Sequence, residues 1–332
     1  MTALKLMTFN VENMLVRYRF RQYEEERLAT LLEFDSDERR AELIRTHWNV
    51  IQDETRVFTA LSILDADPDV ICLQEVENMQ ALRAFHDRYL RRLSGRDFPH
   101  QVLIESHDPR GIDVAVLSRF RITSVVTHQD LTPADVGVPG LTNADGSERR
   151  WVFSRDCLEV HVKKQNRVLP IFVCHFKSMT EGRQKTRPIR EAEAAGVRKI
   201  LDDRFNKKPD EHPWAVVGDL NDYTEMDGQP DPGHGLGKLL DGGFALDVVK
   251  ARVGDPLDRW THFYAGDRQY RQLDYVLLSP ALADENEDAE VRIVRGGQPY
   301  RAEHYKGPRW PRVGYDRPKA SDHCPLCVKL RF

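Results

Sequence analysis

The sequence lacks long apolar runs, internal repeats and low-complexity segments. A transmembrane helix needs about 18 to 20 consecutive apolar residues, and no such run occurs in the 332 residues. The N-terminal segment MTALKLMTFNVEN turns polar too early for a signal peptide. We therefore expect a protein without a membrane span, located in the cytoplasm. The sequence does not predict its oligomeric state.

Net charge of one sign is also largely missing. The 49 Lys and Arg residues nearly balance 53 Asp and Glu residues, which leaves a formal charge of -4. This balance excludes a strongly basic nucleic-acid coat protein. Hydrophobic residues make up 40% and charged residues 31% of the chain, a composition typical of a folded globular protein rather than a disordered one.

Cysteine is scarce. The five residues are Cys72, Cys157, Cys174, Cys324 and Cys327, and an odd number set mostly in apolar runs indicates buried thiols in a reducing compartment. Cys324 and Cys327 have C-x-x-C spacing. Because no second pair accompanies them, the pattern does not favour a zinc site, and we assign them to the core.

Short β-type runs recur along the whole chain. They lie at 4–11, 70–76, 113–119, 157–162, 169–176, 214–220, 273–279 and 325–332. Helical patterns lie at 23–33, 37–66, 78–94 and 188–205. Strands and helices do not alternate strictly, which predicts an α/β protein with antiparallel or mixed sheets covered by helices. No loop has the composition of an interdomain linker.

Polar residues stand at the ends of many of these predicted strands. They are Asn10, Glu75, His175, Asp219, Asn221, Asp322 and His323. Strand ends are where a rigid scaffold presents a functional site, so we expect these side chains to meet in one cleft.

Seven segments in a fixed order carry a family resemblance. They are TFNVEN (8–13), ICLQEVEN (71–78), RGIDVAVLSR (110–119), VCHFKS (173–178), VVGDLND (216–222), QLDYVLLSP (272–280) and SDHCPL (321–326). With these motifs the sequence resembles the deoxyribonuclease I-like endonuclease/exonuclease/phosphatase superfamily, and the motif style is most similar to bacterial extracellular-nuclease-like members. The resemblance implies one domain over residues 1–332. Its fold would be a four-layer sandwich of two mixed β-sheets packed face to face, with helices outside.

Two of these residues suit a hard metal ion. Glu75 supplies a carboxylate and Asn10 an amide oxygen, which are ligand types for Mg²⁺ or Mn²⁺ rather than zinc. The resemblance adds Asp322 close to the metal. A divalent cation stabilises the charge that develops when water attacks a phosphodiester in line. The alternatives are an exposed strand-end acid at 75 and a turn-forming Asn at 10.

The general base has two candidates. His323 needs a carboxylate to fix its tautomer, and the resemblance gives that role to Asp274, which makes His323 the base. Proton abstraction by Asp219 is the alternative, and the sequence leaves both open.

Three further residues complete the predicted centre. Asp219 and Asn221 are separated by one residue, so their side chains share one side of an extended segment; Asn221 would donate to a phosphoryl oxygen while Asp219 orients the water. His175 resembles a second family histidine that donates to the phosphate. Asp113 is the candidate that orients His175, and its alternative role is to cap the turn after Gly111.

Cations near the motifs suggest substrate contacts. Arg155 lies where relatives have a phosphate-contacting Arg, and its guanidinium could bind a phosphate in a bidentate manner. Lys177 and Arg183 belong to a cationic segment, KSMTEGRQKTRPIR, that follows His175. A surface strand Arg and a solvated helix start are the alternatives.

Two other segments could border the cleft. Residues 14–50 are predicted to be a helical insertion that walls the cleft or only packs against the fold. Residues 296–318 interleave Tyr300, Tyr305, Trp310 and Tyr315 with cations, a pattern that suits single-stranded nucleic acid or an ordered loop.

Together these features predict a metal-dependent phosphodiesterase, with DNA or RNA as the expected partner and Mg²⁺ or Mn²⁺ as the cofactor. A phosphatase or phosphodiesterase for a small-molecule or lipid-headgroup phosphate is the first alternative. A catalytically silent binding module is the second, and it is disfavoured because every expected catalytic position carries a functional residue type.

Overall fold

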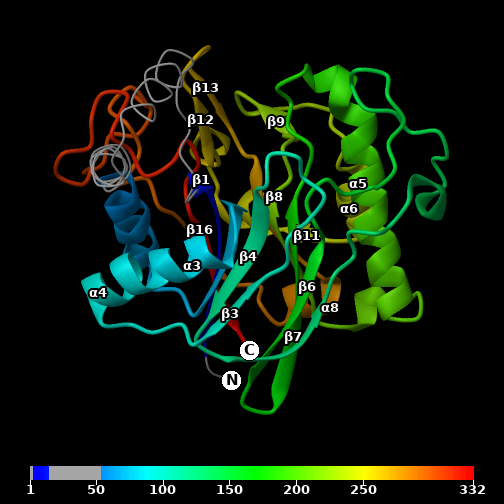
Figure 1. The fold of residues 1–332 in the computed structure, drawn as a ribbon, viewed down its shortest axis with the longest axis horizontal. Coiled ribbons are helices and arrows are strands. Elements are labelled where there is room, and N and C mark those ends of the chain that lie inside the picture. The colour runs from blue at the N-terminus through cyan, green and yellow to red at the C-terminus, as the bar shows by residue number, and fades with distance from the viewer. Residues whose placement is uncertain (1–2, 15–53) are drawn as a thin grey trace, which may run out of the picture.

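Two six-stranded sheets pack face to face and carry helices on both outer sides (Figure 1). The computed structural model describes residues 3–14 and 54–332. The sandwich between the sheets is filled by aliphatic side chains from both of them, such as Leu6, Val116, Val173 and Val217. The predicted fold class, a four-layer α/β sandwich, is confirmed.

The first sheet has the strand order β15-β16-β1-β2-β4-β3. Its strands are β1 (Ala3–Met14), β2 (Val70–Val76), β3 (His100–Leu103), β4 (Asp113–Ser118), β15 (Glu290–Ile293) and β16 (Leu326–Arg331). Strand β1 runs parallel to β2 and antiparallel to β16, so the sheet is mixed. The chain termini therefore meet in the middle of one sheet.

The second sheet has the order β11-β14-β8-β7-β6-β5. Its strands are β5 (Arg121–Val126), β6 (Leu158–Lys164), β7 (Arg167–His175), β8 (Ala215–Asp219), β11 (Leu246–Asp247) and β14 (Asp274–Leu278). Only β7 and β8 are parallel neighbours in it. Two small hairpins pair β9 (Glu225–Met226) with β10 (Gln229–Pro230) and β12 (His262–Tyr264) with β13 (Gln269–Arg271).

Helices cover the outer face of each sheet (Figure 1). On the first sheet lie the helical residues 54–66, α3 (Met79–Phe85), a π-helical turn (His86–Leu90) and α4 (Arg91–Ser94). On the second sheet lie α5 (Arg183–Arg204) and α6 (Gly237–Leu240), while α7 (Val248–Arg252) and α8 (Pro280–Asp284) are short. Asn78 starts α3 by accepting a hydrogen bond from the amide of Ala81.

All eight predicted strands are present; the one at 70–76 matches at both ends, and no end of the others is shifted by more than three residues. The predicted helix at 78–94 is present with a π-helical turn inside it, and the one at 188–205 begins five residues earlier, at Arg183. The earlier start places much of the cationic segment on helix α5. The predicted insertion at 14–50 lies outside the described residues, apart from Met14, which ends β1.

Candidate active site

Four polar side chains lie at the ends of strand faces that are mostly apolar; Thr8 on β1 is a buried polar exception. On β8, Ala215 and Val217 fill the space between the sheets, and Asp219 follows them on the same face because side chains alternate along a strand. The same alternation places His175 after Ile171 and Val173. It also places Asn10 after Leu4 and Leu6, and Asp274 before Val276 and Leu278. The interior between the sheets therefore ends in a polar floor.

Glu75 reaches this floor by a different route. Regular alternation would place it with Ile71 and Leu73, which pack under the helices of the first sheet. Instead, the pairing of β2 with β4 shifts register between Gln74 and Val76, and Glu75 has a φ of 67°. Such a bulge redirects a side chain. The Glu75 carboxylate consequently lies 4.0 Å from Nε2 of His175.

Asp219 is the central acceptor of the site. Its carboxylate accepts hydrogen bonds from the Asn10 side-chain amide (3.0 Å) and from the backbone and side-chain amides of Asn221 (2.9 and 3.0 Å). The preceding Gly218 has a φ of 144°, and a Cβ atom there would lie 1.9 Å from the carbonyl oxygen of Cys174. Only glycine fits this approach of β8 to β7. The G-D pair of the motif thus fixes where the carboxylate lies.

Two imidazoles flank Asp219. Its Oδ2 atom lies 3.6 Å from Nε2 of His175 and 3.7 Å from Nε2 of His323. On its other side, His323 Nδ1 is hydrogen-bonded to the carboxylate of Asp274 (2.8 Å). The predicted pairing of His323 with Asp274 is therefore present in the structure.

Burial and neighbouring charges shift the proton equilibria of this group. Burial raises the pKa of Asp219 to about 7, against the opposing effect of His323. Burial lowers the pKa of His323, but the carboxylates of Asp274 and Asp219 outweigh it and raise the value to about 10. Burial, with the positive charge of Arg155, holds the pKa of His175 well below its ordinary value. The two histidines therefore differ: His323 favours the charged form and His175 the neutral form.

The proposed partner of His175 is not Asp113. The Asp113 carboxylate accepts hydrogen bonds from the amide (2.9 Å) and hydroxyl (2.5 Å) of Ser106. Nδ1 of His175 is buried and has no hydrogen-bond partner in the described part of the chain. Asp113 stabilises the loop after β3 instead, which corrects the prediction that it orients the imidazole.

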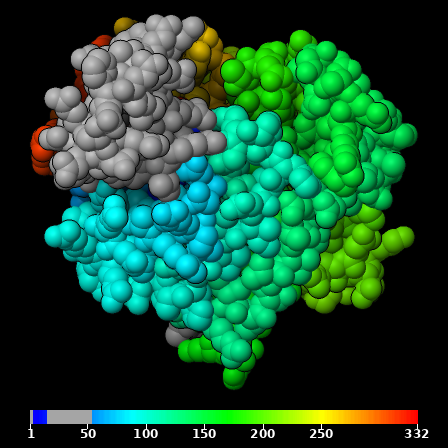
Figure 2. All heavy atoms as spheres, in the orientation of Figure 1, coloured from blue at the N-terminus to red at the C-terminus, as the bar shows by residue number. Residues whose placement is uncertain are grey.

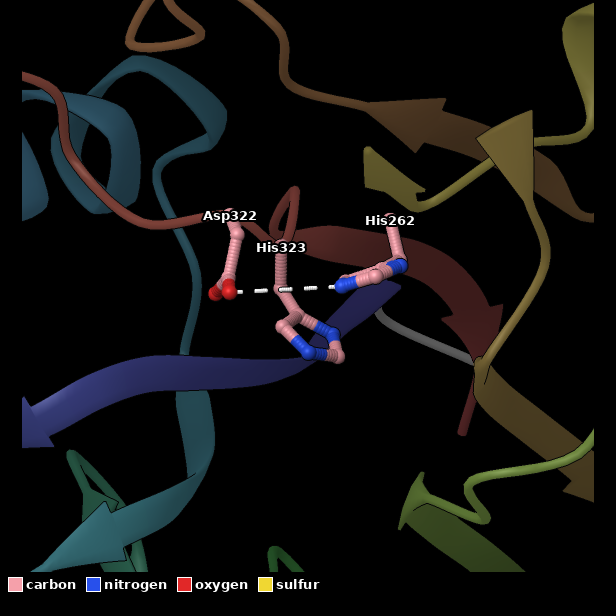
Figure 3. Close-up of side chains that lie close together, drawn as sticks. All are labelled: His262, Asp322 and His323. Atoms are coloured by element: carbon pink, nitrogen blue, oxygen red, sulfur yellow. Dashed lines mark ion pairs between the residues drawn. The ribbon is translucent and has the colours of Figure 1, made fainter. Parts of the chain in front are cut away.

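Asp322 faces a histidine that the sequence did not single out. Its carboxylate lies 4.0 Å from Nε2 of His262 (Figure 3), and the His262 ring in turn contacts the His323 ring, with centroids 4.5 Å apart. Burial acts to raise the pKa of Asp322, but the charge of Lys319 and the neighbouring histidines hold it well below its ordinary value. Burial lowers the pKa of His262 to about 3. A neutral imidazole thus lies beside an ionised carboxylate at the cleft edge.

The oxygen donors at the floor fit a hard divalent cation. One oxygen of Glu75 is fixed by the amide of Asn13 (2.8 Å), and the amide oxygen of Asn10 accepts from the backbone of Glu12 (3.1 Å). The other Glu75 oxygen accepts no hydrogen bond from residues 3–14 or 54–332. Carboxylate and amide oxygens are ligands of Mg²⁺ and Mn²⁺. Further negative charge lies in two clusters, His262–Asp322–His323 and Asp219–Asp274–His323.

The three residues predicted to contact the substrate lie in different environments. The Arg183 guanidinium binds the carboxylates of Asp222 and Asp231, both at 2.7 Å. It therefore supports the fold rather than reaching into the cleft, and the prediction that Arg183 contacts the substrate is wrong. Lys177 pairs with Glu181 (3.0 Å) at the rim. Arg155 is 4% exposed and forms an ion pair with Asp108.

Sequence reasoning missed several residues that hold the centre together. The Thr261 hydroxyl accepts hydrogen bonds from the backbone amides of Leu273 and Asp274, both at 3.0 Å. The Ser321 hydroxyl donates to the carbonyl of Asn10 (2.7 Å) and accepts from the amide of His323 (3.0 Å). Ser321 could have been found from the sequence, because it begins the S-D-H motif. For Thr261 and His262 the sequence offers no signal beyond a short strand.

The site lies at one end of the sandwich. Figure 2 shows an indentation at the upper edge of the molecule, between the yellow residues around β12 and β13 and the green residues near the start of α5. Floor residues come from both sheets, because Asn10 and Glu75 belong to the first sheet and His175 and Asp219 to the second. A match to a family model decides the family. The chain belongs to the endonuclease/exonuclease/phosphatase family, whose model matches residues 7–323.

Solved structures show the same fold at low sequence identity. Truncated TDP2 from Caenorhabditis elegans is 13% identical, with a TM-score of 0.55, and the match covers 99% of this chain and 98% of that one. The catalytic domain of human nocturnin with a bound sulfate anion is 16% identical (TM-score 0.55; 99% and 94% covered). A family protein from Beutenbergia cavernae is 18% identical (TM-score 0.57; 99% and 72% covered).

A comparison with curated protein sequences gave no significant match. Members of the family hydrolyse phosphoric esters and typically depend on a divalent metal. Within residues 3–14 and 54–332, no helix has the length and apolar character required to cross a membrane.

Proposed function

We propose that the protein is a divalent-metal-dependent phosphodiesterase that hydrolyses P–O bonds by in-line attack of water, and that it acts as a nuclease. One observation carries this proposal. Glu75, His175, Asp219 and His323 form a continuous series of contacts of 3.6 to 4.0 Å across the two sheets. An acid, two imidazoles and a further acid at one cleft floor are the groups that phosphoryl transfer to water requires.

The contacts suggest a division of roles. His323 lies between two buried carboxylates, an environment that stabilises its protonated form, so we assign it to donate to a phosphoryl oxygen. Asp219 is held by amides rather than by a Lys or Arg, and we assign it to accept the proton of the attacking water. This assignment favours Asp219 as the general base over His323.

Two other groups bind rather than transfer protons in this proposal. His175 presents Nε2 toward Glu75 and Asp219, where a neutral imidazole donates to the phosphate. Asn221 keeps Asp219 in place, and its side-chain amide donates to Asp219 and to the carbonyl oxygen of Phe176. Donation to the phosphate would require exchanging one of these hydrogen bonds. Glu75 and Asn10, with Asp322 as a further acid nearby, would hold Mg²⁺ or Mn²⁺, which supplies electrostatic stabilisation of the charge developing on the phosphoryl oxygens.

A second candidate is hydrolysis of a small-molecule or lipid-headgroup phosphate ester. The net charge of -4 favours it, because a polyanionic substrate is repelled by an acidic protein. The bound sulfate of the nocturnin structure supports phosphate recognition in this fold without choosing between the two substrate classes.

A substrate panel tests the proposal. Purified protein is assayed with Mn²⁺ or Mg²⁺, and with EDTA, on bis-p-nitrophenyl phosphate, p-nitrophenyl phosphate, a phosphocholine ester, and single- and double-stranded DNA and RNA. We expect EDTA-sensitive cleavage of the diesters and of nucleic acid. Cleavage of the synthetic diester with every nucleic acid left intact at low salt would contradict the nuclease assignment. Full activity in EDTA would contradict the role of the metal.

A further inference from the structure

A cavity of about 640 Å³ lies beside the catalytic floor. Its walls are three loop segments at 107–110, 143–155 and 177–185. The volume falls in the range of sites for small organic ligands, about 300 to 1,000 Å³. None of the roles assigned above uses most of this space.

Flat groups stack along one wall of the cavity. The imidazole of His107 lies parallel to the indole of Trp151, with ring centroids 5.1 Å apart and an interplanar angle of 14°. The Arg150 guanidinium lies 4.6 Å from the Trp151 ring centroid. Nucleobases stack on aromatic rings and on Arg guanidinium planes. A base can therefore extend this stack or replace the exposed Arg150 side chain on the indole.

The cavity also has an excess of positive charge. Its six cations are Arg110, Arg149, Arg150, Arg155, Lys177 and Lys185, and its four acids are Asp108, Asp145, Glu148 and Glu181. Two of the acids are already paired, Asp108 with Arg155 and Glu181 with Lys177, and Arg149 is paired with the buried Glu193 behind the wall (3.6 Å). Arg150 and Lys185 are exposed; Arg150 lies on the Trp151 ring, and the charge of Lys185, after the hydrogen bonds from Ser147, helps to lower the pKa of Asp145. This local excess suits a phosphate on an otherwise acidic protein.

Shared contacts join the cavity to the catalytic floor. The carbonyl oxygen of Phe176 accepts from Arg155 in the cavity wall (3.2 Å) and from Asn221 at the floor (3.1 Å). On the other side, Arg110 donates to the side chain of Asn13 (3.0 Å), whose backbone amide holds Glu75. Phe176 on one side and Asn13 on the other thus contact both the cavity wall and residues of the catalytic floor.

We infer that this cavity is a subsite for an unpaired nucleotide next to the scissile phosphodiester, with its base stacked along Trp151 and its phosphate near Lys185. The inference rests on the proposed function and narrows its substrate class to single-stranded nucleic acid. A base inside a duplex is already stacked, and extracting it costs a few kcal/mol. The duplex is consequently the poorer substrate.

Binding without turnover tests the subsite directly. Fluorescence anisotropy in EDTA compares a short labelled oligothymidylate with an abasic chain of the same length and charge. The wild-type protein binds the base-bearing chain about 5- to 100-fold more tightly, the range that one stacked base provides. In Trp151→Ala this ratio falls toward one, whereas Trp151→Phe retains most of it and shows that the loop still folds. Lys185→Ala weakens both chains by a similar factor.

Tyr315→Ala provides the matched control, because Tyr315 is an aromatic residue that is 55% exposed and lies outside the cavity. Equal binding of the two chains by the wild-type protein, or no measurable binding of either, would overturn the subsite. If Tyr315→Ala but not Trp151→Ala loses the preference for the base-bearing chain, the base is recognised by the 296–318 loop, and the proposed subsite is overturned as well. Hydrolysis of bis-p-nitrophenyl phosphate reports on the proposed function separately, since that assay needs no base.

Discussion

Asp219 and Asp222 are three residues apart in one motif and have opposite environments. Asp219 accepts hydrogen bonds only from amides, and burial raises its pKa to about 7. Asp222 is equally buried but binds Nε of Arg183 (2.7 Å) and Nε of Arg190 (2.9 Å). Burial acts to raise the pKa of Asp222 too, yet the arginine charges outweigh it and lower the value.

The difference separates a reactive carboxylate from a structural one. For Asp219, burial outweighs the single imidazole charge of His323 at 3.7 Å, so this acid can exchange a proton near neutral pH. A buried acid between two guanidinium groups stays ionised and links helix α5 to the loop after β8. The arginines that follow His175 in the sequence therefore stabilise the scaffold on which Asp219 is mounted.

The largest expected effect is on turnover. Asp219→Asn removes the proton acceptor while keeping the side-chain volume, so we expect kcat on bis-p-nitrophenyl phosphate to fall by about 1,000-fold. The thermal unfolding midpoint should fall only modestly, because the amide keeps one acceptor oxygen but turns its NH2 group toward amide donors that the carboxylate accepted. A loss of less than tenfold would remove Asp219 from the reaction.

The next effect is on stability. Asp222→Asn leaves the fully buried Arg190 without its ion-pair partner and leaves Arg183 with Asp231 alone, which should lower the free energy of unfolding by about 3 kcal/mol. Urea unfolding of Asp222→Asn and Asp219→Asn compares the free energies of unfolding of the two variants. If Asp219→Asn unfolds at a lower urea concentration than Asp222→Asn, then Asp219 rather than Asp222 is the structural carboxylate, and the contrast is contradicted.

Acid sensitivity should arise elsewhere, at Glu159. Burial acts to raise its pKa, but hydrogen bonds from His128 and His161 and the charge of Arg204 lower it to about 2. Because the native pKa lies below the ordinary value of 4.5, the stabilisation is complete above that pH. It is lost as the pH falls toward 2, and amounts to about 3 kcal/mol.

Unfolding measured at several pH values checks this expectation. Glu159→Gln should flatten the acid limb of the stability profile and leave turnover at neutral pH close to wild type. An unchanged acid limb in this variant would place the sensitivity at other carboxylates.

The smallest effect should come from Arg183→Lys. Lysine keeps the charge but loses the fork that bridges Asp222 and Asp231, so we expect about 1 kcal/mol of destabilisation. The Michaelis constant for single-stranded DNA should not change by more than twofold. A tenfold increase would restore Arg183 as a substrate contact.

Much of the site was predictable because it follows from alternation along strands. The apolar runs fix which residues face the space between the sheets, and Asn10, His175, Asp219 and Asp274 continue those faces. Glu75 was named from its motif. Its orientation was not predictable, since it depends on a left-handed backbone at a bulge.

Long-range pairing explains most of what sequence reasoning could not supply. Arg183 meets Asp222, 39 residues away, and Arg155 meets Asp108, and neither partner is visible from local spacing. Asp113 accepts a hydrogen bond from Ser106, seven residues before it, and therefore does not orient His175 as predicted. Trp151 and His107 become neighbours only when two loops fold over one cavity.

The metal dependence of Glu75→Gln shows whether the Glu75 carboxylate holds the metal ion on which hydrolysis depends. Hydrolysis of bis-p-nitrophenyl phosphate is measured against free Mn²⁺ concentration for the wild-type protein and the variant, after removal of metal with EDTA. We expect that wild-type activity disappears in EDTA and returns with Mn²⁺, and that the variant needs at least about tenfold more metal for half its maximal rate. Identical metal dependence in the two proteins, or full wild-type activity in EDTA, would contradict this expectation.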